Sequence, residues 1–339
     1  MLRVAAFTGG VTVPSARFRV RQYMPALLQQ GVAISEMPSR FGIYPPQNKW
    51  IRPFWAGATL AEQIPKIIKS HQYDVVLLQR EMLSSFVTLE PLTKTPRVLD
   101  VDDAIFLHRN GDFARRLAQI SDQMICGNTY LADWFSAWNK DITVIPTAVD
   151  TDRYVPVIKQ GKCEGEIIIG WIGTSGNLKY VYAIEAALAK VLKLYPMAKL
   201  RIVCDKKPEF RLIDITRCEF IIWSESTEVE SIQGVDIGIM PLENSEWSRG
   251  KCSYKMLQYM ACGIPVVVSP VGMNAEVLSI GSVGIGAVSE NEWVDAIAAL
   301  LDNFDLREQM GAIGRQVVTE SFSITKIAPL IATCLTGFR

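Results

Sequence analysis

The chain has 339 residues, 49% of them hydrophobic and 21% charged, and its 35 basic residues balance its 35 acidic ones. This length favours two domains, because a single hydrophobic core rarely grows so large. No apolar run approaches the roughly 18 residues that a membrane-spanning helix needs, and no secretion signal is visible at the N-terminus. The seven cysteines form no CxxC pair and only two histidines are present, so we expect a cytoplasmic protein without a metal site.

The charge is unevenly distributed along the chain. Residues 1–70 hold nine basic and two acidic residues, a balance of +7, whereas the remainder holds 26 basic and 33 acidic residues, a balance of −7. This asymmetry suggests that the first segment meets an anionic partner, and we expect that partner not to be a nucleic acid. A few solvated basic faces are the alternative.

Apolar runs of strand length alternate with helical patterns, first over residues 2–150 and then again over residues 165–269. The first series has strand-like runs at 2–10, 73–80, 95–103, 121–128 and 141–150. The second series has strand-like runs at 165–177, 199–205, 219–224, 235–240 and 264–269. Two such series predict an α/β protein with two doubly wound, Rossmann-like domains.

A polar stretch at residues 156–166 reads as the linker between these domains. We therefore expect an N-terminal domain over 1–155, a C-terminal domain over 156–321, and a last helix over about 322–339 that packs back on the first domain. In doubly wound sheets, ligands bind beyond the carboxyl ends of the strands, so we expect the binding residues in the loops there.

The first such loop, residues 8–19, contains Gly10 followed by Arg17 and Arg19. Glycine permits close backbone approach, and the arginines could clamp a phosphate. The loop is not a GxGxxG fingerprint, which disfavours ordinary dinucleotide binding. A flexible loop with surface arginines is the alternative.

Three carboxylates, Asp100, Asp102 and Asp103, crowd the end of the third strand. Like charges at such a distance need cations or hydrogen-bond donors. Asp102 and Asp103 could bind sugar hydroxyls, or Asp100 and Asp102 could hold a divalent metal as a DxD pair. A strand end with satisfied acids is the third possibility.

In the second half, residues 173–176 turn from strand to helix through small residues that suit a phosphate or sugar oxygen, with Asn177 as a plausible N-cap. A helix then follows Ser253, its expected N-cap, and ends at Gly263 before Pro265. Lys251 and Lys255 lie at the positive end of this helix, a conflict that a bound pyrophosphate would relieve.

Residues 259–269 (YMACGIPVVVS) resemble the A-M-A-C-G-x-P-V-V motif of the retaining glycosyltransferases of family 4, which have the GT-B fold. Residues 127–135, 141–154 and 310–324 resemble further segments of that family. The resemblance implies two Rossmann-like domains facing across a cleft and a nucleotide-sugar donor. The family's two motif acids fall on Gly250 and Gln258, and its active-site histidine aligns best with Asp102.

The resemblance implies transfer of a sugar from a nucleotide-sugar to a glycan or lipid-linked acceptor, with retention of configuration and no required metal or cofactor. We expect Gln258 to contact the ribose and both lysines to stabilise the leaving diphosphate. A sugar-nucleotide epimerase or a non-catalytic nucleotide-sugar-binding protein is the alternative.

The expected catalytic residues are Asp102, Asp103, Lys251 and Lys255. The expected donor-binding residues are Gly173, Thr174, Ser175, Lys251, Ser253, Tyr254, Lys255 and Gln258. Gly10, Arg17 and Arg19 are the expected acceptor- or phosphate-binding residues.

Aromatic residues follow the first basic segment in a proline-containing stretch that does not read as regular structure: Phe41, Tyr44, Trp50, Phe54 and Trp55. Beside basic residues that include Arg21 they suit an anionic amphiphile, so we expect peripheral contact with the inner membrane face. Packing of these aromatics under a loop is the alternative.

Overall fold

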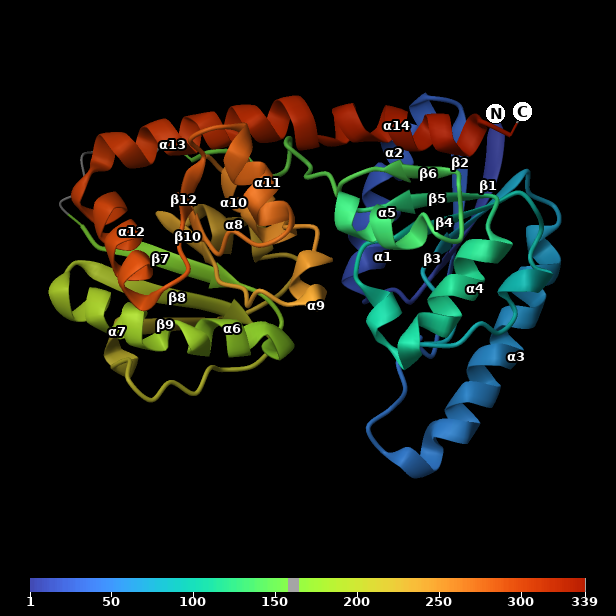
Figure 1. The fold of residues 1–339 in the computed structure, drawn as a ribbon, viewed down its shortest axis with the longest axis horizontal. Helices are drawn as coiled ribbons and strands as arrows, with labels where there is room; N and C mark the ends of the chain where they lie inside the picture. Colours follow the sequence, from blue (N-terminus) through green and yellow to red (C-terminus); the bar gives the residue numbers. More distant parts are fainter. Residues whose placement is uncertain (158–164, 339) are drawn as a thin grey trace. The chain divides into compact units, whose positions relative to one another are not determined.

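The computed structural model describes residues 1–157 and 165–338 and divides the chain into two compact units. The first unit comprises Met1–Ala148, Arg249–Cys252 and Ile324–Arg339, and the second comprises Val149–Ser248 and Ser253–Ser323. Each unit is built on a parallel six-stranded sheet with helices on its faces (Figure 1). The expected linker at 156–166 falls mostly on 158–164, outside the described residues.

The sheet of the first unit has the order β2-β1-β3-β4-β5-β6. Its strands are β1 (Leu2–Thr8), β2 (Val32–Pro38), β3 (Val75–Gln79), β4 (Arg97–Val101), β5 (Gln123–Cys126) and β6 (Ile142–Val144). Its helices are α1 (Pro14–Arg19), α2 (Met24–Gln29), α3 (Arg52–Ser70), α4 (Asp112–Ile120), α5 (Thr129–Phe135) and α14 (Ile324–Thr336). Short 3₁₀ turns in this unit are η1 (Arg21–Tyr23), η2 (Lys49–Ile51), η3 (Glu90–Leu92), η4 (Ile105–Leu107) and η5 (Arg109–Gly111).

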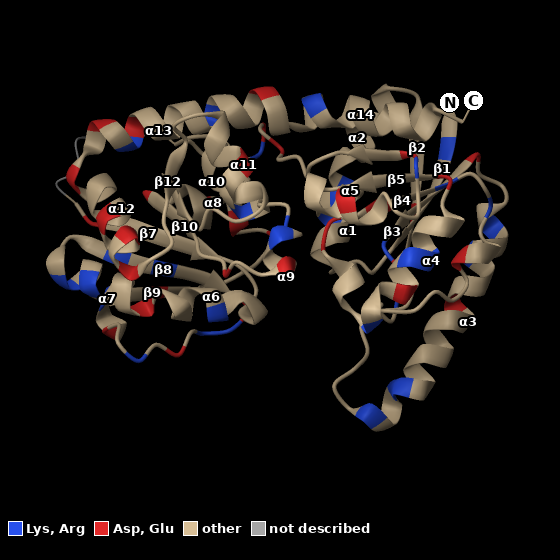
Figure 2. Ribbon diagram, in the orientation of Figure 1, with Lys and Arg blue, Asp and Glu red and all other residues tan. Residues whose placement is uncertain are grey.

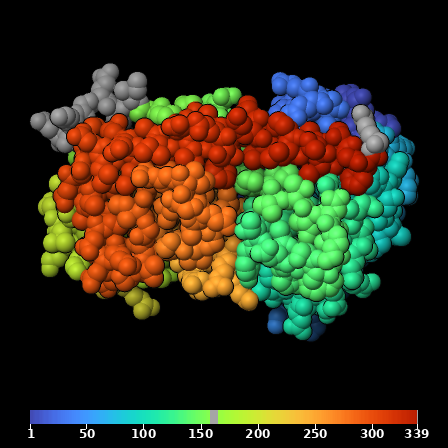
Figure 3. Space-filling model, turned by 45° about the horizontal axis from the view of Figure 1, so that its top comes forward, coloured from blue at the N-terminus to red at the C-terminus, as the bar shows by residue number. Residues whose placement is uncertain are grey.

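The C-terminal helix α14 is part of the core of the first unit. Its buried side chains, among them Ile327, Ile331 and Leu335, pack with Val4 of β1 and Leu27 of α2. In Figure 3 the dark red end of the chain lies directly against blue N-terminal segments. Burial of this apolar stripe ties the two ends of the chain into one hydrophobic core.

The sheet of the second unit has the order β12-β11-β10-β7-β8-β9. Its strands are β7 (Ile167–Ile172), β8 (Ala198–Cys204), β9 (Cys218–Ile222), β10 (Ile237–Met240), β11 (Val266–Val268) and β12 (Gly284–Gly286). Its helices include α6 (Leu178–Ala183), α7 (Glu185–Leu194), α8 (Glu228–Gln233), α9 (Glu246–Arg249), α10 (Tyr254–Ala261), α11 (Met273–Ile280), α12 (Glu290–Asp302) and α13 (Phe304–Val317). The 3₁₀ turns η6 (Ser175–Asn177) and η7 (Ile215–Arg217) and the π-helix η8 (Val318–Phe322) complete it. Leu188, Ile202 and Trp293 lie in its core.

Two expectations about regular structure need correction. The strand-like runs of the sequence missed β2 and β12, which are edge strands: β2 is mostly half-exposed, and β12 has three residues, two of them glycine. The aromatic stretch after residue 48 is regular, because η2 leads into the 19-residue helix α3, whose Pro53 lies in the first turn, where its missing N–H is not needed. Across residues 1–157 and 165–338, no helix combines the length and apolar character that crossing a membrane requires.

Candidate active site

The first buried ion pair of the site region joins Asp100, at the end of β4, to Arg19 of α1. The Arg19 Nε lies 3.0 and 3.1 Å from the two Asp100 carboxylate oxygens, and its Nη1 donates to the Ile145 carbonyl at 2.9 Å. Burial raises the pKa of Asp100, and Arg19 opposes that shift. This pairing corrects one expectation, because Arg19 is a buried structural cation rather than a phosphate ligand. It also gives Asp100 a protein partner, against the alternative of a divalent metal shared with Asp102.

Asp102 and Asp103 lie just beyond β4 beside Arg80, which follows β3. The Arg80 Nη1 is 3.1 Å from an Asp103 oxygen and 3.9 Å from an Asp102 oxygen. Arg80 is buried and adopts a left-handed backbone conformation with φ of 66°. Burial and the neighbouring Asp102 raise the pKa of Asp103 to about 6. The structure therefore brings both expected aspartates together and adds Arg80, which the sequence marks only as a charge directly after a buried strand.

The peptide Arg249–Cys252 belongs to the first unit and packs beside these aspartates. The Asn128 Nδ2 donates to the carbonyls of Arg249 and Lys251 at 3.3 and 3.2 Å. A Cβ on Gly250 would lie 2.7 Å from the Ala104 Cβ, so no side chain fits there. This close approach explains why glycine stands where the resembling family has an acid. It also places Lys251 near Asp103, whose pKa it lowers against the effect of burial.

The loop after β1 is held by contacts within the first unit. The Gly10 carbonyl accepts a hydrogen bond from the Arg21 Nη2 at 2.9 Å, and Arg21 also pairs with Glu36 at 2.9 Å. Arg17 is half-buried, with its guanidinium 4.7 Å from the centre of the Phe18 ring. Of the arginines expected to form a basic surface here, Arg19 is buried and Arg21 is held by Glu36, whereas Arg17 is half-buried beside Phe18.

In the second unit, residues 173–176 follow β7 as expected, but a carboxylate that the sequence analysis missed holds them. The Ser175 N–H and hydroxyl donate to the two Asp205 oxygens, both at 2.7 Å. Although burial opposes it, these bonds lower the pKa of Asp205. The Asn177 side chain makes no N-cap bond and donates instead to the Thr174 hydroxyl at 3.0 Å. Asp205 directly follows β8, which is the signal that could have identified it.

A polar network surrounds the start of α10. The Lys255 Nζ lies 2.9 Å from the Gln258 Oε1 and 3.4 Å from a Glu228 oxygen. The Gln258 Nε2 donates to the Tyr154 hydroxyl at 2.7 Å and lies 3.4 Å from Glu228, and Tyr154 donates to Glu228 at 3.0 Å. Glu228 is nearly inaccessible, whereas the Lys255 side chain keeps 27% of its surface exposed.

This network changes the expected role of Gln258. Its side chain is fully buried and bonded at both ends to protein groups, so we revise its role from ribose contact to holding Lys255 and Tyr154 in place. Ser253 occupies the N-cap position of α10 as predicted, but its φ is 51° and its hydroxyl makes no cap bond to the helix. Lys255 and Tyr254 occupy the first turn of α10 as expected, and Gly263, with φ of 70°, follows the helix end.

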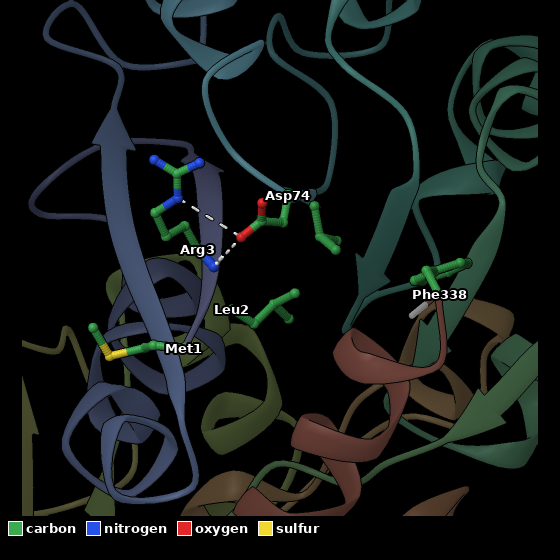
Figure 4. A pocket seen from close by; sticks show the side chains of 6 residues that line it. Met1, Leu2, Arg3, Asp74 and Phe338 are labelled. Carbon is green, nitrogen blue, oxygen red and sulfur yellow. Dashed lines mark hydrogen bonds and ion pairs between the residues drawn. The ribbon is translucent and has the colours of Figure 1, made fainter.

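The hollow drawn in Figure 4 lies elsewhere, at the amino ends of β1 and β3. Its polar groups pair with each other, since the Arg3 N–H donates to Asp74 at 2.7 Å. We therefore place the candidate active site at the carboxyl ends of the strands rather than in this hollow. In the described part of the chain, no three His, Cys, Asp or Glu side chains are grouped so that they could hold a metal ion.

Residues 166–303, most of the second unit, match the family described as glycosyl transferases group 1. Solved structures match over nearly the whole chain at low identity. They include the sucrose-phosphate synthase of Thermosynechococcus elongatus (TM-score 0.71, 15% identity, 100% of this chain and 99% of that chain). They also include WaaG, a glycosyltransferase of lipopolysaccharide biosynthesis (0.68, 12%, 99% and 100%). HepE of Anabaena, solved with UDP and glucose, is a third (0.68, 14%, 99% and 100%). A search of curated proteins gave no match.

The match over residues 166–303 agrees with the predicted resemblance to group 1 glycosyltransferases, and the two parallel six-stranded sheets confirm the predicted fold with two Rossmann-like domains of the GT-B type. The structural likeness, at 12–15% identity, concerns the fold. Membership of the retaining family 4 and the roles of individual residues remain predictions.

Proposed function

We propose that the protein transfers a hexose from a nucleotide-sugar to a glycan or lipid-linked acceptor, with retention of the anomeric configuration and without a required metal or cofactor. The observation that carries this proposal is Lys255, held by buried Glu228 and Gln258 at the positive end of α10, within the segment that matches group 1 glycosyltransferases. A preorganised cation at a helix N-terminus suits the charge that develops on a departing diphosphate.

On the donor side, Lys255 contacts the diphosphate together with the backbone of the 173–176 loop. Asp205 fixes that loop through Ser175, so its N–H groups are held in position before the donor arrives. Tyr254, next to Lys255 in the first turn of α10, contacts the nucleotide. The complex of HepE with UDP and glucose supports a uridine diphosphate sugar as the first donor to test.

On the acceptor side, Asp102 and Asp103 bind sugar or acceptor hydroxyls, and Arg80 and Lys251 keep the two carboxylates close together. With a pKa near 6, Asp103 is ionised at neutral pH yet can accept a proton from an acceptor hydroxyl as it attacks. Arg17 and the backbone of Gly10 lie at the carboxyl end of the neighbouring β1 and contribute anion contacts.

A screen of nucleoside diphosphates and their sugars by thermal shift tests this proposal, because binding raises the apparent stability as RT ln(1+[L]/Kd). We expect one base to stabilise the protein and its sugar conjugate to release free diphosphate slowly. Appearance of an epimer from donor alone would instead indicate an epimerase. Binding without any turnover of donor, in the presence of candidate acceptors, would indicate a non-catalytic nucleotide-sugar-binding protein.

A further inference from the structure

The outer face of helix α3 is apolar from Pro53 to Ile68. The solvent-exposed positions of this helix are Pro53, Phe54, Gly57, Ala58, Ala61, Ile64, Pro65, Ile68 and Lys69. Of the buried positions, Thr59, Gln63 and Ser70 are polar, and Ile67 is apolar. A surface helix of a globular protein ordinarily shows the opposite arrangement, so this face is built to meet an apolar environment.

The first turns of this helix carry the largest exposed apolar side chains. Trp50 in η2 is 86% exposed, and Phe54 is 80% exposed. Ile51 lies between them and is also exposed. With Ile64 and Ile68 further along, the apolar face extends over about 22 Å at 1.5 Å per residue. Trp50 and Phe54 therefore do not pack under a loop, whereas Trp55 is only partly exposed and bonds to the loop at Phe41.

The charged residues around the N-terminal end of α3, its free end, are all basic. From Met37 to Ala61 the chain contains no acidic residue, while it contains Arg40, Lys49 and Arg52. The next acid, Glu62, is held by Lys66 and by the Arg40 N–H. In Figure 2 the free end of α3 shows blue and no red, in agreement with this composition.

We propose that the free end and outer face of α3 dock on an anionic lipid bilayer. Indole and phenyl rings favour the headgroup region, and lysines and arginines beside them attract anionic lipids. A protein partner would ordinarily make hydrogen bonds across such an area, whereas Lys69 supplies the one polar side chain among the exposed positions of α3. An interfacial helix with basic flanks requires no such bonds.

The docking surface adjoins the acceptor side of the candidate active site. The loop from Ser39 to Asn48 joins the carboxyl end of β2 to η2, and Trp55 anchors it by donating to the Phe41 carbonyl at 3.1 Å. Tyr44 in this loop interacts electrostatically with Arg80 and Asp103. A lipid-linked acceptor in the bilayer would therefore enter beside the aspartates, a consequence that rests on the proposed function.

Flotation of the full chain with vesicles tests the docking surface without donor or acceptor. Vesicles of phosphatidylglycerol and phosphatidylcholine are compared with vesicles of phosphatidylcholine alone, each at low and high salt. We expect binding to the anionic vesicles, weakened by salt because the attraction is screened. Trp50→Ser with Phe54→Ser should weaken this binding at least tenfold, and Lys49→Glu should also weaken it severalfold.

Matched controls change equally exposed residues of the second unit. Ile222→Ser with Val288→Ser removes two exposed apolar side chains, and Lys207→Glu reverses an exposed charge. These variants should bind anionic vesicles as the wild type does. Absence of binding at low salt, or equal losses in test and control variants, would overturn the proposal. So would a dimer in solution that the Trp50 and Phe54 substitutions dissociate, because the face would then bind a second copy of the chain.

Discussion

Lys255→Ala removes the cation that the proposed function places on the departing diphosphate. Its ammonium lies 2.9 Å from Gln258 and 3.4 Å from Glu228, and it retains an exposed surface from which to contact donor. A charge-assisted hydrogen bond is worth about 1.5–3 kcal/mol, so kcat/KM should fall on the order of 10- to 100-fold. Initial rates of nucleoside diphosphate release over a range of donor concentrations measure this loss.

The same substitution also affects stability, and that effect must be separated from catalysis. Without Lys255, the buried Glu228 carboxylate keeps the Tyr154 hydroxyl and the Gln258 amide but loses the Lys255 ammonium. Because Lys255 is partly exposed, we expect a cost of about 1–2 kcal/mol, below the value for a fully buried pair. Adding Glu228→Gln to Lys255→Ala should restore the melting temperature without restoring activity.

A matched control is Lys206→Ala, which removes an exposed lysine paired with Glu209 at 3.7 Å. This variant should keep both the stability and the activity of the wild type. If folded Lys255→Ala retains activity within about twofold of wild type, the assignment of Lys255 to the diphosphate is refuted.

Three further predictions concern the aspartates, Gln258 and Gly250. Since the pKa of Asp103 is raised to about 6, the kcat/KM profile should fall as the pH drops below about 6, and Asp103→Asn should abolish that dependence. The protonated Asp103 should also stabilise the fold at low pH, a contribution lost as the pH rises through about 6, which urea titrations at several pH values would detect. Gln258→Glu should lower the melting temperature at neutral pH, because it buries a second carboxylate beside Glu228. If the variant is instead as stable as wild type and binds donor more tightly, the ribose-contact role of Gln258 is supported. Gly250→Ala should cost about 1–3 kcal/mol through its clash with Ala104, and an unaltered denaturant midpoint would contradict the packing seen here.

The sequence predicted the central strands because each is a continuous apolar run, as parallel strands buried on both faces require. Edge strands carry weaker patterns: β2 is half-exposed along most of its length, and β12 is too short to show a period. The end of helix α3 was predicted from the helical pattern at residues 64–72, but its N-terminal part was not. Pro53 and the outward-facing aromatic residues of that part disguised the helix.

The sequence could predict which loops form the candidate site, but not which side chains contact each other within it. Asp102, Asp103 and the 173–176 loop were found because they follow strands, and Asp205 and Arg80 could have been found by the same rule. The sequence could not show that Arg19 turns inward to Asp100, since the two residues are 81 positions apart. Nor could it show that Gln258 is buried against Tyr154, because that contact spans 104 positions.

The most direct test of the central claim is to follow one reaction by proton NMR with the nucleotide-sugar that best stabilises the protein. We predict release of nucleoside diphosphate together with a new glycosidic anomeric signal of the same configuration as the donor. Inversion of that configuration would contradict the proposed retention. Failure of every nucleotide-sugar to bind, or conversion of the donor to an epimer without acceptor, would contradict the glycosyltransferase function itself.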